Sequence, residues 1–242
     1  MCVKKKGKKI ISVCVFNKTP SYDSHLSLIR ALTDIGKELD CKVNIKWPTL
    51  DGITNSGIKE VLDNTDGIIV TEDLSFPSEK ERILKYARQN RIPTLGISFG
   101  CQLMAIEFAK NACGVRNATS EELSSSKNLL VKLTEKKVGG FYTIIKNGSS
   151  CNKIYGKGKI RERHRHSSEI NPHFKNILEE NGMKISGKRE DGQIDIIEVA
   201  THPFYIGVQF HPEYLSRPLS PDPLLLKFVH TCKVLRWKKT KL

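Results

Sequence analysis

The first half of the chain alternates short apolar runs with segments in which apolar residues recur at helical spacing. The apolar runs at 10–16, 43–47, 67–70 and 93–97 predict buried strands. The segments between them predict helices over 78–90 and 102–112, and an earlier one with an apolar face of Leu26, Ile29, Leu32 and Ile35. Strands that alternate with helices pair in parallel, so this half predicts a doubly wound sheet that binds ligands at the carboxyl ends of its strands.

The second half of the chain has a different pattern. Runs at 129–133, 141–145, 194–199 and 206–210 predict strands with no long helix between the first three, and 223–235 predicts a closing helix. The pairs Gly139-Gly140 and Asn147-Gly148 predict hairpin turns. We therefore expect an α/β fold, a mostly parallel sheet with helices on both faces. It would form one domain over residues 9–236, flanked by basic tails at 1–8 and 237–242.

The charge balance adds an expectation about partners. The 242 residues include 40 Lys and Arg against 26 Asp and Glu, a net charge of +14 that attracts anions. Much of this charge lies in the end runs KKKGKK and RWKKTK, where solubilising charge is the ordinary role. No apolar run reaches the roughly 18 residues of a membrane span, and the common nucleic-acid-binding signatures are absent. We expect a cytoplasmic protein that binds a small molecule, without a membrane or nucleic-acid partner; a homo-oligomer or a protein partner stays open.

Metal and cofactor sites are not indicated. The seven cysteines are scattered without a C-x-x-C pair, which argues against a disulfide framework and a structural zinc site. His164 and His166 would share one face of a strand and could bind a metal, but the alternating Arg163 and Arg165 favour a basic binding edge. Residues 182–189 imitate a phosphate-binding loop but end in arginine, with no helix pattern after them. We expect no cofactor and no metal.

Two motifs carry the candidate chemistry. Gly96-Ile97-Ser98-Phe99-Gly100 is a G-x-S-x-G sequence between a predicted strand and a predicted helix, the setting of a nucleophile elbow. An ordinary tight turn with a serine cap is the alternative. His211-Pro212-Glu213 follows another predicted strand and offers a base with a carboxylate to orient it. Both motifs lie at carboxyl ends of strands, so we expect a Ser98–His211–Glu213 triad.

Longer stretches resemble the glutaminase domain of CTP synthases. They are 66–70, 102–109, 162–166 with 169–172, and 205–218, so that the resemblance runs from about residue 10 to residue 235. It implies a flavodoxin-like class I glutamine amidotransferase fold. It also implies that the catalytic residues are Ser98, His211 and Glu213, and that the substrate-binding residues are Gln102, Glu121, Phe99, Arg165 and His166.

The departures from that family concern its chemistry. Ser98 stands where the family has its cysteine nucleophile, and a hydroxyl is a far weaker nucleophile than a thiolate. The family's glycine-rich oxyanion loop is replaced by residues 71–77, which bring in Glu72 and Asp73. Ser167 stands where the family's arginine pairs with the substrate carboxylate. The synthetase half of the family is not present in this sequence.

Three functions follow. The first is a hydrolase that uses the serine triad on an amide or related bond of a small molecule other than free glutamine. The second is a catalytically inactive relative with a binding or regulatory role. The third, disfavoured by the three departures, is a residual glutaminase that supplies ammonia for CTP synthesis.

Overall fold

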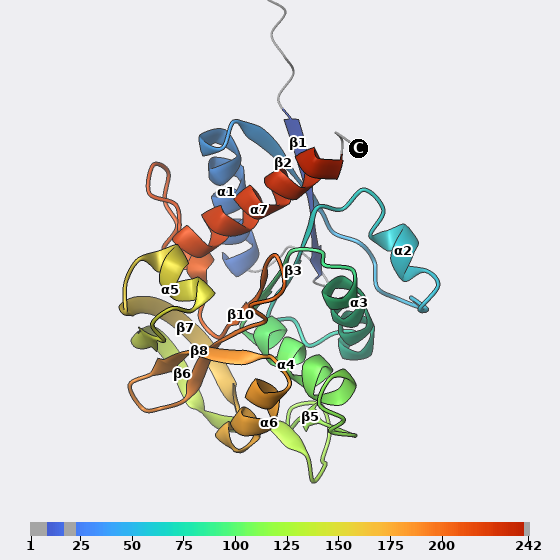
Figure 1. Ribbon diagram of the computed structural model, residues 1–242, viewed down its shortest axis with the longest axis vertical. Helices are drawn as coiled ribbons and strands as arrows, with labels where there is room; N and C mark the ends of the chain where they lie inside the picture. Colours follow the sequence, from blue (N-terminus) through green and yellow to red (C-terminus); the bar gives the residue numbers. More distant parts are fainter. Residues whose placement is uncertain (1–8, 17–22, 240–242) are drawn as a thin grey trace, which may run out of the picture.

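The computed structural model describes residues 9–16 and 23–239, and a central sheet runs through it (Figure 1). The first half of the chain contributes β1 (Lys9–Phe16), α1 (Asp23–Glu38), β2 (Cys41–Lys46), α2 (Ile58–Val61), β3 (Gly67–Val70), α3 (Pro77–Gln89), β4 (Thr94–Ile97) and α4 (Phe99–Asn111). The second half contributes β5 (Thr119–Ser120), β6 (Leu129–Ile145), α5 (Ser150–Tyr155), β7 (Lys159–Ile170), η1 (Pro172–Phe174), α6 (Lys175–Glu180), β8 (Lys184–Arg189), β9 (Ile194–Glu198), β10 (Tyr205–Val208), η2 (Pro212–Tyr214) and α7 (Pro223–Lys239).

The strand order is β2-β1-β3-β4-β10-β9-β8-β6-β5, with β7 paired to β6. Neighbouring strands are parallel from β2 to β10 and antiparallel from β10 through β9 and β8 to β6. The predicted α/β class is confirmed. Because β4 and β10 are adjacent and parallel, the segments that follow them, which carry Ser98 and His211, leave the same end of the sheet.

Two apolar cores cover the two faces of the sheet. One contains the buried side chains of α3 and α4, and the other those of α1 and α7. Helix α1 buries Leu28, Leu32 and Ile35, whereas the predicted face residue Leu26 is 63% exposed. The predicted helical period was correct, but the buried stripe is rotated toward Leu28.

Several local predictions for the second half were wrong. Gly139 and Gly140 do not turn the chain, because both lie inside β6, which runs 17 residues without a break. The turn at Asn147-Gly148 leads into the short helix α5 instead of a hairpin. Most of the stretch that imitates a phosphate loop is the strand β8, so it offers no helix terminus to a phosphate. Among the residues described, no helix is both long and apolar enough to cross a membrane.

Candidate active site

Ser98 occupies a strained elbow between β4 and α4. Its backbone has φ 56° and ψ −115°, outside the conformations that an L-residue ordinarily adopts. Its N–H donates to the carbonyl of Val208 at 2.8 Å, which ties the elbow to the end of β10. Such a conformation costs about 1–3 kcal/mol and persists only where the surrounding structure enforces it. The side chain is nearly closed off, since Ser98 is 3% exposed.

Two glycines allow the elbow to pack against the sheet. A Cβ atom at Gly100 would lie 2.0 Å from the carbonyl oxygen of Val70, at the end of β3. A Cβ atom at Gly96 would lie 2.4 Å from the sulfur of Met104. The two glycines of the motif are thus required because the backbone of α4 comes directly against β3 and β4.

His211 and Glu213 form a buried pair after β10, at the same end of the sheet as this elbow. Nδ1 of His211 lies 2.7 Å from Oε1 of Glu213, and the two residues are 1% and 3% exposed. Burial alone would lower the pKa of His211, but the charge and the hydrogen bond of Glu213 outweigh it and raise the pKa above its ordinary value. Within residues 9–16 and 23–239, Nε2 of His211 has no hydrogen-bond partner, so the hydroxyl of Ser98 is not bonded to it here.

The loop after β3 contributes one carboxylate to this area. Asp73 is turned toward the buried Lys80, whose Nζ lies 3.2 Å from Oδ2 and 2.6 Å from the carbonyl oxygen of Asp73. Glu72 instead accepts a hydrogen bond from the hydroxyl of Ser24, and its charge helps to raise the pKa of His211. Of the two acids that sequence analysis placed in the oxyanion loop, Glu72 is therefore the one that acts on the site.

Gln102 lies in a closed network of side chains one turn beyond the elbow. Its amide nitrogen donates to the carbonyl and hydroxyl oxygens of Ser168, at 2.9 and 3.0 Å. The hydroxyl of Ser168 lies 2.9 Å from Oε2 of Glu122, and the amide of Gln209 donates to the Ser168 carbonyl at 3.1 Å. These contacts use the groups of Gln102 that a substrate would need. Sequence reasoning missed Glu122, although the adjacent acids at 121 and 122 were a signal for it.

The other predicted substrate-binding residues are dispersed. Glu121 is exposed and accepts from the N–H of Leu133 at 2.9 Å, away from Gln102. Phe99 is buried in the first turn of α4. Arg165 is half exposed and pairs with Asp23 at 2.9 Å.

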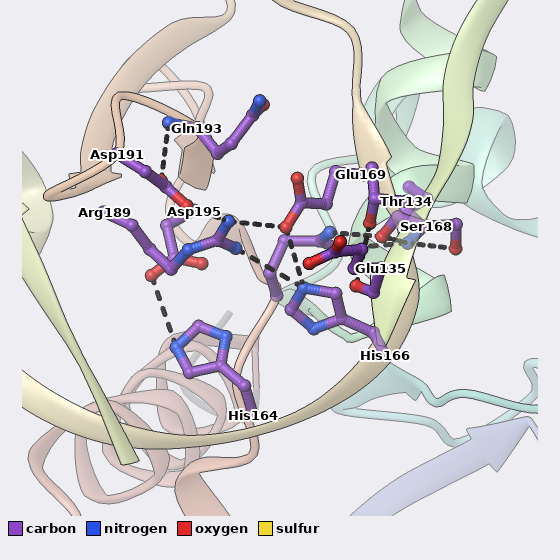
Figure 2. A network of polar contacts seen from close by, with 12 residues as sticks. Thr134, Glu135, His164, His166, Ser168, Glu169, Arg189, Asp191, Gln193 and Asp195 are labelled. Carbon is purple, nitrogen blue, oxygen red and sulfur yellow. Dashed lines mark hydrogen bonds and ion pairs between the residues drawn. The ribbon is translucent and has the colours of Figure 1, made fainter. Parts of the chain in front are cut away.

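His166 points to the opposite side of β7 from Arg165 and belongs to a buried polar network (Figure 2). There Arg189 lies 2.6 Å from Glu169 and 2.7 Å from Asp191, and His166 lies 3.4 Å from Glu169. His164 is 3.6 Å from Asp195 in the same network. Burial lowers the pKa of His164 to about 3 and raises that of Asp195 to about 7. This network holds β7, β8 and β9 together from inside.

A group of buried carboxyls lies near Glu213. Burial, with the charges of Asp222, Asp195 and Glu213 nearby, raises the pKa of Glu162 to about 9. Burial likewise raises the pKa of Asp222 to about 7. Burial and the neighbouring negative charges oppose ionisation, so Glu162 is in its neutral form at neutral pH.

We expect this arrangement to make the protein less stable as pH rises. The pKa of Glu162 in the folded protein is above its value in the unfolded chain. Its stabilising contribution to the free energy of unfolding is therefore fully present below about pH 4.5. It is lost as pH rises toward 9, by about 1 kcal/mol per pH unit. Glu162→Gln should therefore flatten the fall of unfolding free energy between pH 6 and pH 8, measured by urea titration. Glu38→Gln, at an exposed position of α1, is the matched control. An unchanged slope in Glu162→Gln would contradict the assignment.

The fold, the strained elbow and the His–Glu pair together define a class I glutamine amidotransferase domain. The sequence profile of that family, described as "Glutamine amidotransferase class-I", matches residues 21–231, and the chain belongs to this family.

Within the class, the similar proteins are CTP synthases. The chain is 36% identical over 225 residues to the CTP synthase of Bdellovibrio bacteriovorus, covering 86% of this chain and 42% of that protein. It is 38% identical over 242 residues to the CTP synthase of Wolinella succinogenes, covering 90% and 43%. The chain thus spans less than half the length of these relatives.

Solved structures agree with the family. The glutaminase domain of Trypanosoma brucei CTPS with bound acivicin superimposes with a TM-score of 0.86 at 25% identity, covering 93% of this chain and 94% of that chain. A glutamine amidotransferase from Thermotoga maritima, at 13% identity and a TM-score of 0.54, shares the fold. This chain is therefore a CTP-synthase-like glutaminase domain in fold.

Proposed function

We propose that this domain does not work as a glutaminase and that its elbow is a serine-based hydrolase site for an amide or related bond of another small molecule. The observation that carries the proposal is the backbone of Ser98, held at φ 56° at the same end of the sheet as a His211–Glu213 pair with a 2.7 Å contact. A strained nucleophile position and an oriented base are two of the parts that a serine hydrolase needs, together with an oxyanion donor.

The chemistry would begin with proton transfer from Ser98 to Nε2 of His211. Attack of Oγ on the carbonyl carbon forms a tetrahedral intermediate, and Glu213 stabilises the imidazolium through Nδ1. The N–H of Phe99, which follows the nucleophile at the start of α4, would be the oxyanion donor. The serine–histidine bond would have to form when substrate binds, as catalytic hydrogen bonds often do.

Free glutamine fits this site poorly. Gln102 is bonded to Ser168, and Glu121 is bonded to Leu133, so neither is available to an amino-acid substrate. Glu72 places a carboxylate near His211, in the loop where the family keeps glycines. A negative charge there raises the barrier to any oxyanion, so the site favours a substrate whose own donor or cationic group offsets the charge of Glu72.

A non-catalytic binding role is the second candidate. The observations that favour it are the unbonded Nε2 of His211 and the closure of the Gln102–Ser168–Glu122 network. In that case the same elbow would bind a ligand or a protein without turnover, and Ser98 would be chemically inert.

Labelling with a fluorophosphonate probe separates the two roles. We expect the probe to modify wild type and not Ser98→Ala, whereas Ser125→Ala, at an exposed loop serine, should label like wild type. Because the pKa of His211 is raised, labelling should increase with pH through a midpoint above 6.5, the ordinary histidine value. Glu213→Gln should move that midpoint to lower pH and slow the reaction. Equal labelling of wild type and Ser98→Ala would reject the hydrolase role.

A further inference from the structure

One face of β7 carries a row of exposed cations. Lys159, Arg161, Arg163 and Arg165 are exposed, and the residues between them are buried, as alternation along a strand requires. At about 3.4 Å per residue, neighbouring members lie about 7 Å apart, and the row extends for about 20 Å. These four residues are called the β7 cation row below.

The strand β6 places an aromatic and two aliphatic side chains beside this row. Its register sets Ile144 opposite Lys159, Tyr142 opposite Arg161 and Val138 opposite Arg165. These three β6 residues are 51%, 45% and 58% exposed. Nζ of Lys159 lies 4.3 Å from the ring centroid of Tyr142, and the Arg161 guanidinium lies 5.9 Å from it. An exposed ring therefore lies among cations on an open sheet surface.

Part of this positive charge is not compensated. Lys159 pairs with Glu190 at 2.6 Å and Arg165 with Asp23 at 2.9 Å. Across the described ranges, Arg161 and Arg163 take part in no ion pair. The row ends at a cavity of about 580 Å³ whose charged lining is Arg163, Arg165 and Arg217 against the single carboxylate of Asp23, so the net positive surface continues toward η2.

The surface is accessible on the outside of the molecule. Figure 1 shows β6 and β7 on the opposite side from α2 and α3, and β7 pairs with no strand other than β6 among those described. The positive face is therefore not the back of a packed layer, and an elongated ligand could lie along it.

We propose that this β6–β7 face binds single-stranded nucleic acid. Evenly spaced guanidinium and ammonium groups follow a phosphate backbone, and arginine binds phosphate through two hydrogen bonds. Tyr142 offers the ring on which an unpaired base stacks. Duplex DNA is read by elements that enter a groove, whereas a flat strand face with an aromatic residue suits an extended single strand. The alternation of Arg163 and Arg165 indicated a basic edge in the sequence, but only strand pairing brings Tyr142 of β6 beside it. The proposal does not depend on the chemistry proposed for Ser98.

Fluorescence anisotropy with a labelled oligomer of about 20 thymidine nucleotides tests this proposal. Four phosphate contacts predict a slope of about −3 in a plot of log affinity against log salt. Arg161→Ala with Arg163→Ala should reduce that slope by about 1.4 and weaken binding more than tenfold at low salt. Tyr142→Ala should weaken binding roughly tenfold without changing the slope, because it removes stacking and no charge.

The control variant Arg30→Ala with Lys85→Ala removes the same charge from exposed positions of α1 and α3. We expect it to bind the oligomer with less than a threefold loss of affinity, with circular dichroism confirming that all variants are folded. If the two double variants lost the same affinity for the oligomer, binding would depend only on the net charge of the protein, and the proposal would be overturned. It would also be overturned if phosphatidylserine vesicles bound through the same arginines while the oligomer did not bind.

Discussion

We expect Gly100→Ala to destabilise the protein severely, by about 3 kcal/mol or more. The new methyl group would lie 2.0 Å from the carbonyl oxygen of Val70. Neither partner can move easily, because Val70 ends the central strand β3 and residue 100 lies in the first turn of α4. Both segments are fully buried, and overpacked interiors force backbone shifts that cost free energy. Urea unfolding should show the loss, and the melting temperature should fall by roughly 10 °C.

Gly158→Ala is the matched control for this substitution. A Cβ atom at Gly158 would meet nothing within 4 Å, and its backbone does not have a positive φ. This variant should unfold within about 0.5 kcal/mol of wild type. Wild-type stability in Gly100→Ala would mean that α4 does not lie directly against β3, and the geometry described for the elbow would be wrong.

We expect Ser98→Cys to remain without glutamine hydrolysis, although it replaces the hydroxyl with the better nucleophile. A thiol at a helix N-terminus beside a histidine is readily deprotonated, so the thiolate itself should form. The oxyanion would still face Glu72 instead of a loop of glycine N–H groups, and each missing donor costs about 3–4 kcal/mol. Ser167 would still leave the substrate carboxylate unpaired, which costs several kcal/mol more. Ammonia release should stay far below the rate of roughly 1 per second that is usual for enzymes.

Alkylation distinguishes an unreactive thiol at position 98 from a site that has a reactive thiol but cannot hydrolyse glutamine. Mass spectrometry should show that iodoacetamide modifies the thiol of Ser98→Cys faster than that of Cys101, whose pKa is raised by burial and which has no histidine partner in the proposed site. Turnover should need Ser98→Cys together with Ser167→Arg and a glycine-rich loop at 71–77. Rapid ammonia release by Ser98→Cys alone would show that exchanging the serine oxygen for sulfur is sufficient for glutaminase activity. The loop at 71–77 and Ser167 would then not prevent glutamine hydrolysis.

The sequence alone predicted the fold class, the elbow at Ser98 and the His211–Glu213 pair, because each is indicated by residues that are close together in the chain. The change from alternating strands and helices to successive strands marks the point where the sheet becomes antiparallel. The motif of Gly96, Ser98 and Gly100 placed the elbow because it is one continuous five-residue pattern, although the atom that excludes a side chain at Gly100 belongs to Val70 of β3, 30 positions away. The pair of His211 and Glu213 was predicted for the same reason, being two residues apart at one strand end.

Only the tertiary structure decided how far the strands extend and which partners the side chains around the site contact. Gly139 and Gly140 look like a turn in the sequence, but pairing with β7 on one side keeps β6 extended through them. Glu122 reaches Ser168 across 46 positions, whereas its neighbour Glu121 turns away to Leu133.

Two adjacent side chains of β7 show why the partners of a residue cannot be predicted from its neighbours in the sequence. Arg165 and His166 point to opposite faces, one toward Asp23 at the surface and the other toward Arg189 in the interior. Such outcomes depend on strand register and on contacts between distant segments. The local pattern of a sequence does not contain them, because a pairing shift of one residue would exchange the two faces.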